Sequence, residues 1–211
     1  MQDFRLYVIV DADICAGAGG NILKIARRVV SAGADLLQLR AKNATDRKIL
    51  ALGRKIKKIT KDTATRLIIN DRADLAKIIG ADGVHLGQGD LPVKEARKIL
   101  GKDQIIGLST HGLKQAVAAE QQGADYIGLG PIFTTATKPG VRCLTPKIIT
   151  QIKAKIKIPF VAIGGITLKN IGQITARGAQ RVAVCRAIVE AKDVGKTAKA
   201  FKQRLNQSAK Q

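Results

Sequence analysis

The side chains best suited to chemistry in this 211-residue chain stand at the ends of short apolar runs. Gln38, Arg40 and Lys42 alternate along one such run, so in an extended strand their side chains would lie on the same side. A guanidinium fork beside an ammonium group suits the binding of a phosphate or a diphosphate. The alternative is a basic strand edge that faces solvent.

Two carboxylates follow the next two apolar runs. Asp71 stands in Asn70-Asp71-Arg72, and Asp90 follows the run that contains His85. Paired carboxylates can bind Mg²⁺, which keeps several waters and takes its other ligands from substrate phosphates. Either Asp alone would also fit a helix N-cap, Asp71 in particular. Because both follow neighbouring runs, the sequence predicts a magnesium site beside the diphosphate site.

Ser109 and His111 follow the fifth apolar run. Either could bind a substrate, and either could instead cap the next helix. Nothing in the sequence indicates a group that would orient a general base, so a Ser-His-Asp triad is not expected. His85 lies inside an apolar run, which is typical of a core histidine with satisfied hydrogen bonds.

A long polar loop and a pair of glycines follow the sixth and seventh runs. Residues 128–140 hold threonines, prolines and Lys138, which suit a clamp that grips an anion and excludes water, although a merely flexible loop is the alternative. Gly164 and Gly165 would let backbone N–H groups approach an anion. Cys185-Arg186 follows the eighth run, and barrels often hold a phosphate after strands seven and eight. A second anion subsite is therefore predicted.

These residues need elements that bring the ends of many strands together. Branched apolar runs alternate with segments of helical spacing, including those behind the possible caps Asn21 and Thr45. Eight alternations within 211 residues favour the α/β class and a closed TIM (β/α)8 barrel, with an open doubly wound sheet as the alternative. The expected strands are Leu6–Val10, Leu36–Leu39, Leu67–Ile69, Gly83–Leu86, Ile105–Leu108, Tyr126–Leu129, Phe160–Ile163 and Arg181–Val184.

The tripeptide Gly-Ala-Asp recurs before three of the expected strands, at Gly33, Gly80 and Gly123. Gly178-Ala179-Gln180 repeats it with one change. Each glycine fits a helix C-terminus, so these segments are predicted to form the αβ turns on the lower face of the barrel.

Composition indicates one domain over residues 1–211, since no Pro/Gly/Ser-rich linker interrupts the alternation. No apolar run approaches the roughly 20 residues that cross a bilayer, and the first residues lack a signal-peptide pattern, so no membrane association and a cytoplasmic location are expected. The three cysteines are widely spaced and odd in number, which favours reduced thiols over disulfides or a zinc site.

The net charge of +21 is extreme for such a chain. It could indicate a nucleic-acid partner, an anionic substrate or a solvated outer face, because many of the basic residues fall in the expected helices. With four Phe, two Tyr and no Trp, few rings are available for base stacking, so no specific nucleic-acid partner is expected.

Six segments together resemble the thiamine-phosphate synthase family, in the correct order and over nearly the whole chain. They are QLRAK, IINDRADLA, ADGVHLGQGD, IIGLSTH, ADYIGLGPIFTTATKPG and VAIGGI. The resemblance implies a TIM barrel and a transferase of thiamine biosynthesis, EC 2.5.1.3. Such an enzyme would join 4-amino-5-hydroxymethyl-2-methylpyrimidine diphosphate to 4-methyl-5-(2-phosphoethyl)thiazole, or to its carboxylated form, giving thiamine phosphate and diphosphate.

The resemblance also implies roles for individual residues. The pyrimidine diphosphate would be held by Gln38, Leu39, Arg40, Ala41, Lys42, Asn70, Ser109 and Lys138. The thiazole phosphate would be held by Thr135, Ala136, Thr137, Gly165, Cys185 and Arg186. Asp71 and Asp90 would bind Mg²⁺, the expected cofactor, while Arg40, Lys42 and Lys138 would be catalytic because they stabilise charge on the departing diphosphate.

The chain departs from the family pattern at two positions. Many relatives have Glu where Ala41 stands, and Ser where Arg186 stands beside Cys185. The rival functions are a thiazole tautomerase-like enzyme, which would not need the full pyrimidine diphosphate and Mg²⁺ site, and a non-catalytic barrel that binds thiamine precursors or RNA. The sequence leaves the oligomeric state open.

Overall fold

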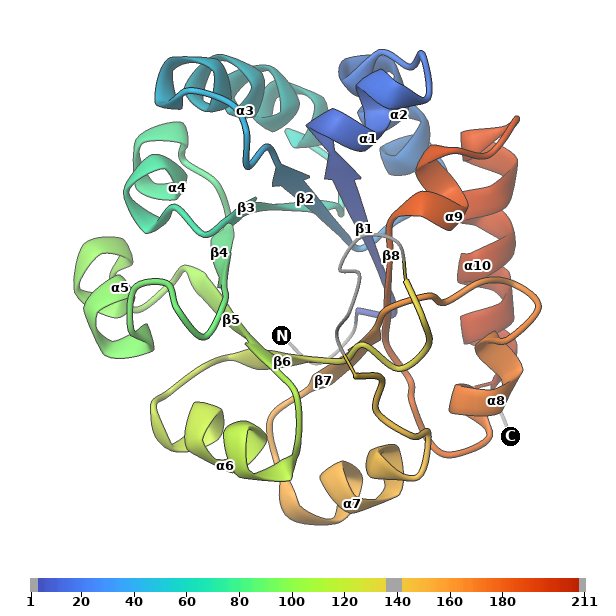
Figure 1. Cartoon of the computed structure of the whole chain (residues 1–211). Helices are drawn as coiled ribbons and strands as arrows, with labels where there is room; N and C mark the ends of the chain where they lie inside the picture. Colours follow the sequence, from blue (N-terminus) through green and yellow to red (C-terminus); the bar gives the residue numbers. More distant parts are fainter. Residues whose placement is uncertain (1–3, 136–141, 209–211) are drawn as a thin grey trace.

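Eight parallel strands close into a barrel in the computed structural model, which describes residues 4–135 and 142–208 (Figure 1). The strands follow one another around the barrel in chain order, and β1 pairs with β8, with Leu6 opposite Val182. The strands are β1 (Leu6–Asp11), β2 (Leu36–Arg40), β3 (Arg66–Asn70), β4 (Gly83–Leu86), β5 (Ile105–Thr110), β6 (Tyr126–Leu129), β7 (Phe160–Ile163) and β8 (Val182–Val184). Closure confirms the predicted TIM barrel and excludes the open sheet.

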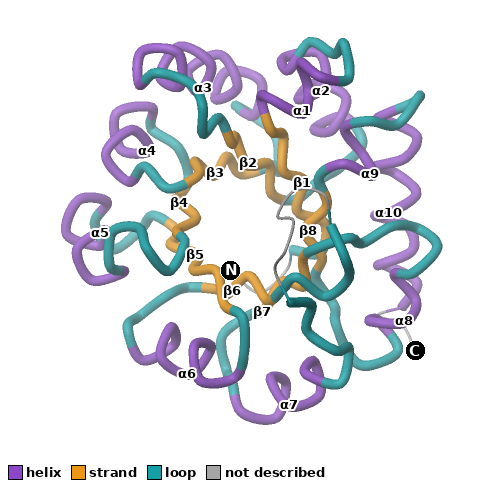
Figure 2. Tube along the Cα trace, viewed as in Figure 1, coloured by secondary structure: helices purple, strands orange, loops and turns teal. Residues whose placement is uncertain are grey.

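Helices surround the ring of strands, as Figure 2 shows in purple outside orange. In the described residues they are α1 (Ala12–Gly17), α2 (Ile22–Ser31), α3 (Asp46–Thr60), α4 (Ala73–Ile79), α5 (Val93–Leu100), α6 (Leu113–Gln121), α7 (Ile148–Lys155), α8 (Ile171–Thr175), α9 (Arg186–Val189) and α10 (Val194–Ser208). Asn21 and Thr45 cap α2 and α3 as predicted, because their side-chain oxygens accept backbone N–H groups of the first turn. Within the described residues, no helix has the length and apolar character needed to cross a bilayer.

Several strands run one or two residues further than the apolar pattern predicts. β1 ends at Asp11, β2 at Arg40, β3 at Asn70 and β5 at Thr110. The polar residues at these ends are therefore held by the strand ladder itself and not by loops. Strand pairing fixes their backbone positions, which suits a site that needs precise geometry.

Alternate strand residues fill two separate cores. One cluster occupies the inside of the barrel and includes Tyr7, Leu36, Ile68, Tyr126 and Val161. The other lies between the barrel and the helices and holds most of the remaining apolar residues. Both faces of each strand are thus covered, as an all-parallel sheet requires.

The Gly-Ala-Asp segments form the αβ turns at the N-terminal ends of the strands. Gly33, Gly80 and Gly123 have φ values of +82°, +70° and +85°, in the left-handed region that glycine adopts readily. The Asp at the end of each tripeptide makes two hydrogen bonds to one residue near the start of the preceding strand. The Asp82 carboxylate accepts the Leu67 N–H at 2.7 Å, and the Asp82 N–H donates to the Leu67 carbonyl at 2.9 Å. Asp35 bonds Leu6 and Asp125 bonds Ile106 in the same two ways.

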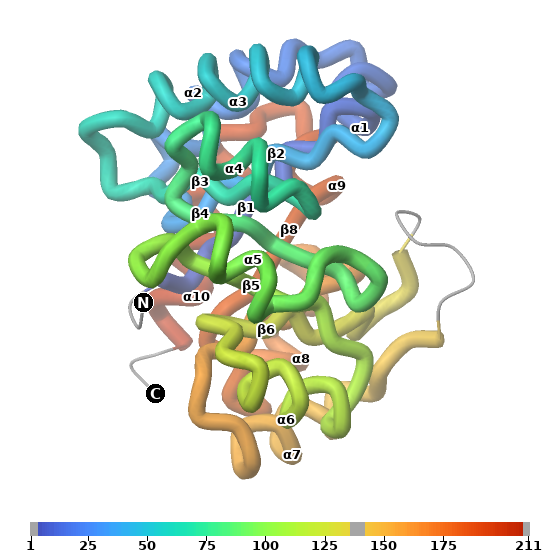
Figure 3. Tube along the Cα trace, turned by 90° about the vertical axis from the view of Figure 1, so that its left-hand side faces the viewer, coloured from blue at the N-terminus to red at the C-terminus, as the bar shows by residue number. Residues whose placement is uncertain are grey.

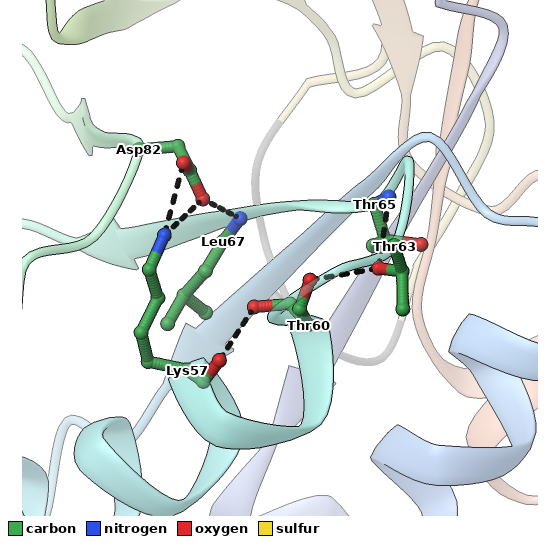
Figure 4. A network of polar contacts seen from close by, with 6 residues as sticks. All are labelled: Lys57, Thr60, Thr63, Thr65, Leu67 and Asp82. Atoms are coloured by element: carbon green, nitrogen blue, oxygen red, sulfur yellow. Dashed lines mark hydrogen bonds and ion pairs between the residues drawn. The ribbon is translucent and has the colours of Figure 1, made fainter.

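A cation completes each of these turns. Figure 4 shows the middle one, in which Lys57 Nζ lies 3.0 Å from both carboxylate oxygens of Asp82. Arg97 forms an ion pair with Asp125, and Lys202 forms one with Asp35. Figure 3 shows the barrel from the side, with the turn between α3 and β3 at the left-hand edge and the described part of the loop after β6 at the right. The αβ turns thus stabilise the face opposite the polar strand ends.

Replacing Asp82 should lower stability. Asp82→Ala removes the acceptor of the Leu67 N–H and leaves Lys57 without its carboxylate, so we expect the free energy of unfolding to fall by about 1–2 kcal/mol. Urea denaturation measures the change. Asp103→Ala, at an exposed position, is the control and should stay within about 0.5 kcal/mol. Equal effects of the two substitutions would contradict the role of the turn.

Candidate active site

A pocket of about 350 Å³ lies at the C-terminal ends of the strands. Its lining includes side chains from all eight strands or from the residues directly after them. Of the residues predicted from the sequence, it brings together Gln38, Arg40, Lys42, Asn70, Asp71, Asp90, Ser109, Thr135, Gly165, Cys185 and Arg186. The predicted cations, carboxylates and hydroxyl groups therefore share one cavity.

Some of the predicted residues lie elsewhere. Leu39 and Ala41 are 1% and 6% exposed and belong to the core between barrel and helices, so their side chains do not line the pocket. Their alternation with Gln38, Arg40 and Lys42 is the expected strand pattern. Ala136, Thr137 and Lys138 lie outside the described residues.

Asp11 and Arg40 form a largely buried ion pair at one wall of the pocket. The two residues are paired in register at the ends of β1 and β2, and Asp11 is 1% exposed. One carboxylate oxygen of Asp11 accepts from Arg40 Nη1, and the other accepts the backbone N–H groups of Asp13 and Ile14 at 3.0 and 3.1 Å. Asp11 therefore caps α1 and positions the Arg40 guanidinium at the same time.

Asp71 and Asp90 lie together after β3 and β4, beside Lys42, which follows β2. Lys42 Nζ is 3.2 Å from Asp71 Oδ2, and Asp90 Oδ2 accepts the Gly87 N–H at 2.6 Å. Neither carboxylate caps a helix, because the N-cap residues of α4 and α5 are Arg72 and Pro92. The cap explanation therefore does not account for this pair.

The backbone at Asp71 is held in a conformation that few residues other than glycine adopt. Its φ is +63°, in the left-handed region, and its N–H donates to the His85 carbonyl at 2.8 Å. Asp tolerates this region better than most residues, yet backbone strain of this kind persists only where the surrounding structure imposes it. Pairing of β3 with β4 holds Asp71 in place and directs it toward the pocket.

The two carboxylates repel each other electrostatically. Burial raises the pKa of the Asp71 carboxyl above its ordinary value of 3.8, and Asp90 raises this pKa further, while Lys42 lowers it. A divalent cation would relieve the repulsion, and two carboxylates with room for further oxygen ligands are a donor set that suits Mg²⁺. Within residues 4–135 and 142–208, no cluster of three or more His, Cys, Asp or Glu residues is placed to hold a metal ion.

The paired glycines after β7 lie under the loop that follows β6. Gly164 and Gly165 have φ values of +100° and +61°, and a Cβ on Gly165 would lie 2.4 Å from the Thr134 carbonyl oxygen. The Phe133 N–H donates to the Gly164 carbonyl at 3.1 Å. These glycines are thus required for the close approach of two loops, a reason that the sequence did not reveal.

Cys185 and Arg186 stand at the start of α9. Burial raises the pKa of the Cys185 thiol to about 12, with a further contribution from the Asp11 charge, so the thiol is neutral at pH 7. Arg186 Nη1 pairs with Glu190, while Arg186 Nε is buried and has no hydrogen-bond partner among the described residues. A buried donor left unpaired in a pocket wall suits an anionic ligand.

Ser109, His111 and His85 all line the pocket. Neither Ser109 nor His111 caps α6, whose N-cap residue is Gly112. His111 Nδ1 lies 2.5 Å from the Gly130 carbonyl oxygen, and His85 Nε2 lies 2.9 Å from Ser109 Oγ. His85 has hydrogen-bond partners, as expected of a core histidine, but it also faces the cavity.

Sequence reasoning missed several residues of the pocket wall, among them the polar residues Tyr7, Asp11, His85 and Tyr126. Asp11 could have been found, because it follows an apolar run as Asp71 does. The two tyrosines and His85 lie inside apolar runs, and nothing in one sequence separates such residues from the core.

Comparison with known proteins gives one consistent result. A model of the family described as thiamine monophosphate synthase matches residues 6–188. A thiamine-phosphate synthase from Halalkalibacterium halodurans is 44% identical over 98% of both chains, and one from Clostridioides difficile is 40% identical over 91% of this chain and 90% of its own. The solved structure of a thiamine phosphate pyrophosphorylase from Pyrococcus furiosus superposes with a TM-score of 0.88 at 32% identity, covering 97% of this chain and 96% of that one.

The Asp11–Arg40 pair should contribute to stability as a coupled unit. Asp11→Ala removes a helix cap and leaves a half-buried guanidinium unpaired, so we expect a loss of about 3 kcal/mol in the free energy of unfolding. A double-mutant cycle with Arg40→Ala, followed by urea denaturation, measures the coupling. If the two single losses simply add in the double variant, the pair is not the unit described.

Asp71 should make stability depend on both pH and Mg²⁺. Because its pKa is raised, the folded protein keeps this proton to a higher pH than the unfolded chain, so the metal-free protein loses stability as pH rises from 3.8 through the raised pKa. Asp71→Asn should remove this part of the pH slope, raise the metal-free Tm at pH 7.5 by about 2–4 °C and abolish stabilisation by Mg²⁺. Thermal melts with and without Mg²⁺ measure both effects. An unchanged Mg²⁺ response would exclude Asp71 from the metal site; Asp46→Asn, at an exposed position, is the control.

Proposed function

The chain belongs to the thiamine monophosphate synthase family, and we propose that its barrel pocket joins a pyrimidine diphosphate to a thiazole phosphate. The activity is that of a transferase of an alkyl group, EC 2.5.1.3, whose products are thiamine phosphate and diphosphate. The observation that carries the proposal is the gathering of three cations and two adjacent carboxylates in one pocket. A cytoplasmic location is part of the same proposal.

The pyrimidine diphosphate, ring and diphosphate together, is assigned to the wall formed by β2, β3 and β5. Arg40 and Lys42 supply positive charge, while Gln38, Asn70 and Ser109 supply hydrogen bonds. The sequence expectation for Lys138 is kept as part of this proposal, although the residue lies outside the described ranges.

Mg²⁺ is the proposed cofactor, with Asp71 and Asp90 as its protein ligands. Their proximity, the raised pKa of Asp71 and their all-oxygen chemistry support this assignment. When bound, the ion would supply positive charge that neutralises the diphosphate. Lys42, at 3.2 Å from Asp71, would contact the same region from the protein side.

The thiazole phosphate is assigned to the wall formed by the loops after β6, β7 and β8. Thr135, Gly165, Cys185 and Arg186 line it, and the unpaired Nε of Arg186 supports an anion there. Ala136 and Thr137 remain predicted members of this subsite. Arg186, where many relatives have Ser, would add a charged donor to the thiazole side of the pocket.

The chemistry needs no protein nucleophile. The bond between the pyrimidine methylene carbon and the diphosphate oxygen breaks, and its electron pair leaves with the diphosphate. Arg40 and Lys42 stabilise the charge that grows on the leaving oxygens. The electron-rich aminopyrimidine supports the positive charge left on the methylene carbon, and the thiazole nitrogen then donates its lone pair to that carbon. The enclosing walls exclude water, which would otherwise capture the carbon.

The direct test measures formation of thiamine phosphate from the two substrates with Mg²⁺, and again with EDTA. We expect metal-dependent product, and a loss of about 100-fold or more in the Asp71→Ala, Asp90→Ala double variant. The matched control removes two exposed carboxylates outside the pocket, in Asp46→Ala, Asp103→Ala, and should keep the activity.

A folded protein that binds both substrates without turnover would favour the precursor-binding barrel. Thiazole isomerisation without condensation would favour the tautomerase-like enzyme. Either result would contradict the proposed reaction.

A further inference from the structure

A continuous chain of hydrogen bonds crosses the inside of the barrel along the wall of the pocket. Gln38 Nε2 donates to Tyr7 Oη at 2.5 Å, and Tyr126 Oη donates to Tyr7 Oη at 3.1 Å. His85 Nδ1 lies 2.9 Å from Tyr126 Oη, and His85 Nε2 lies 2.9 Å from Ser109 Oγ. The chain links five strands, and all five side chains line the cavity.

Burial keeps the two phenols and the amide at one end of this hydrogen-bond chain away from solvent. Tyr7 and Tyr126 are 1% and 0% exposed, and Gln38 is 2% exposed. Burial raises the pKa of both phenols well above the ordinary value, so both remain neutral hydroxyl groups at pH 7. In such surroundings an unpaired polar atom is costly, so each group is held to its partner.

Two glycines inside strands leave room for this chain of hydrogen bonds. A Cβ on Gly107 would lie 2.1 Å from Tyr126 Cζ, and a Cβ on Gly128 would lie 3.1 Å from His85 Cε1. Glycine weakens a strand interior, so its presence in two adjacent strands calls for a reason. The reason is close approach: a side chain at position 107 would overlap the Tyr126 ring, and one at position 128 would crowd the His85 ring.

The hydrogen bonds of this chain converge on Tyr7, whose hydroxyl oxygen accepts from Gln38 on one side and from Tyr126 on the other. Because the Tyr126 hydroxyl donates to Tyr7, its oxygen is left to accept from His85 Nδ1, and in a neutral imidazole His85 Nε2 would then accept from Ser109. At the other end Gln38 uses its amide N–H to bond Tyr7, so its carbonyl oxygen is left as an acceptor. The two ends, Gln38 and Ser109, are the residues assigned to the pyrimidine substrate.

We propose that Tyr126 and Tyr7 are positioning residues that fix the hydrogen-bonding pattern of Gln38 and Ser109, and that this pattern selects an amino over an oxo substituent on the pyrimidine ring. The inference rests on the proposed function for its substrate class. An amino group donates and an oxo group only accepts, so an acceptor fixed in the wall would face another acceptor in the oxo compound. A site built around such a hydrogen bond rejects the mismatched analogue strongly.

The test compares the 4-amino pyrimidine diphosphate with its 4-oxo analogue in wild type, Tyr126→Phe and Phe4→Leu. Tyr126→Phe removes only the hydroxyl that joins Tyr7 to His85. Phe4→Leu is the matched control, because the Phe4 ring packs edge-on against Tyr126 with centroids 6.0 Å apart but carries no polar group. Binding is measured by calorimetry and turnover by thiamine phosphate formation.

We expect wild type to prefer the amino compound, and Tyr126→Phe to reduce that preference at least 10-fold. The change should come from the amino compound, as lower kcat and higher KM, with KM for the thiazole phosphate unchanged. Phe4→Leu should keep the wild-type preference even if its Tm falls. Should Tyr126→Phe not fold, Tyr7→Phe breaks the chain at its next member and is scored by the same ratio.

An unchanged preference in a folded variant would overturn the inference, as would an equal change in Phe4→Leu. Wild-type protein that does not discriminate between the two compounds would overturn it as well. Failure of the proposed function is distinguishable, since it appears as absent product, whereas the preference is also read from binding.

Discussion

The register of the parallel strands decides which side chains meet at the mouth of the barrel. Asp11 lies opposite Arg40 because β1 and β2 pair one residue beyond the apolar runs, and Asn70, at the end of β3, lies opposite His85 inside β4. A shift of one residue would turn each strand over and send these polar groups into the outer apolar core. The ion pair, the metal-binding carboxylates and the buried hydrogen-bond chain all depend on this register.

Much of this arrangement could be predicted because barrels place chemistry at strand ends. The helix caps Asn21 and Thr45 and the αβ turns were identified from local signals, and the pocket collects Arg40, Asp71 and Ser109 as expected. The place of Tyr126 in the pocket wall could not be predicted, because an aromatic residue in an apolar run ordinarily belongs to the core and its partner Tyr7 lies 119 residues away. Leu39 and Ala41 show the limit of assigning a whole motif, since alternate residues of a strand face opposite sides.

The charge of the chain and the charge of the pocket are separate features. Each Lys or Arg that lines the described part of the pocket has a carboxylate partner: Asp11 for Arg40, Asp71 for Lys42 and Glu190 for Arg186. Exposed positions on the outer helices, among them Arg27, Arg54, Lys55 and Lys58, carry much of the excess of +21 instead. Paired cations hold their geometry before an anion arrives, and only part of their charge is left to bind it.

The three Gly-Ala-Asp turns differ in where their cations come from. Lys57 lies 25 residues before Asp82, and Arg97 lies 28 residues before Asp125. Each of these two turns is therefore completed by a cation from a helix that is near in the sequence. Lys202, in α10, reaches Asp35 across 167 residues, and the Asp35 carboxylate also accepts the N–H groups of Arg5 and Leu6 where β1 begins. This turn joins the first and last elements of the chain. During synthesis on the ribosome, this turn therefore gains its cation only when α10 has emerged, after all eight strands.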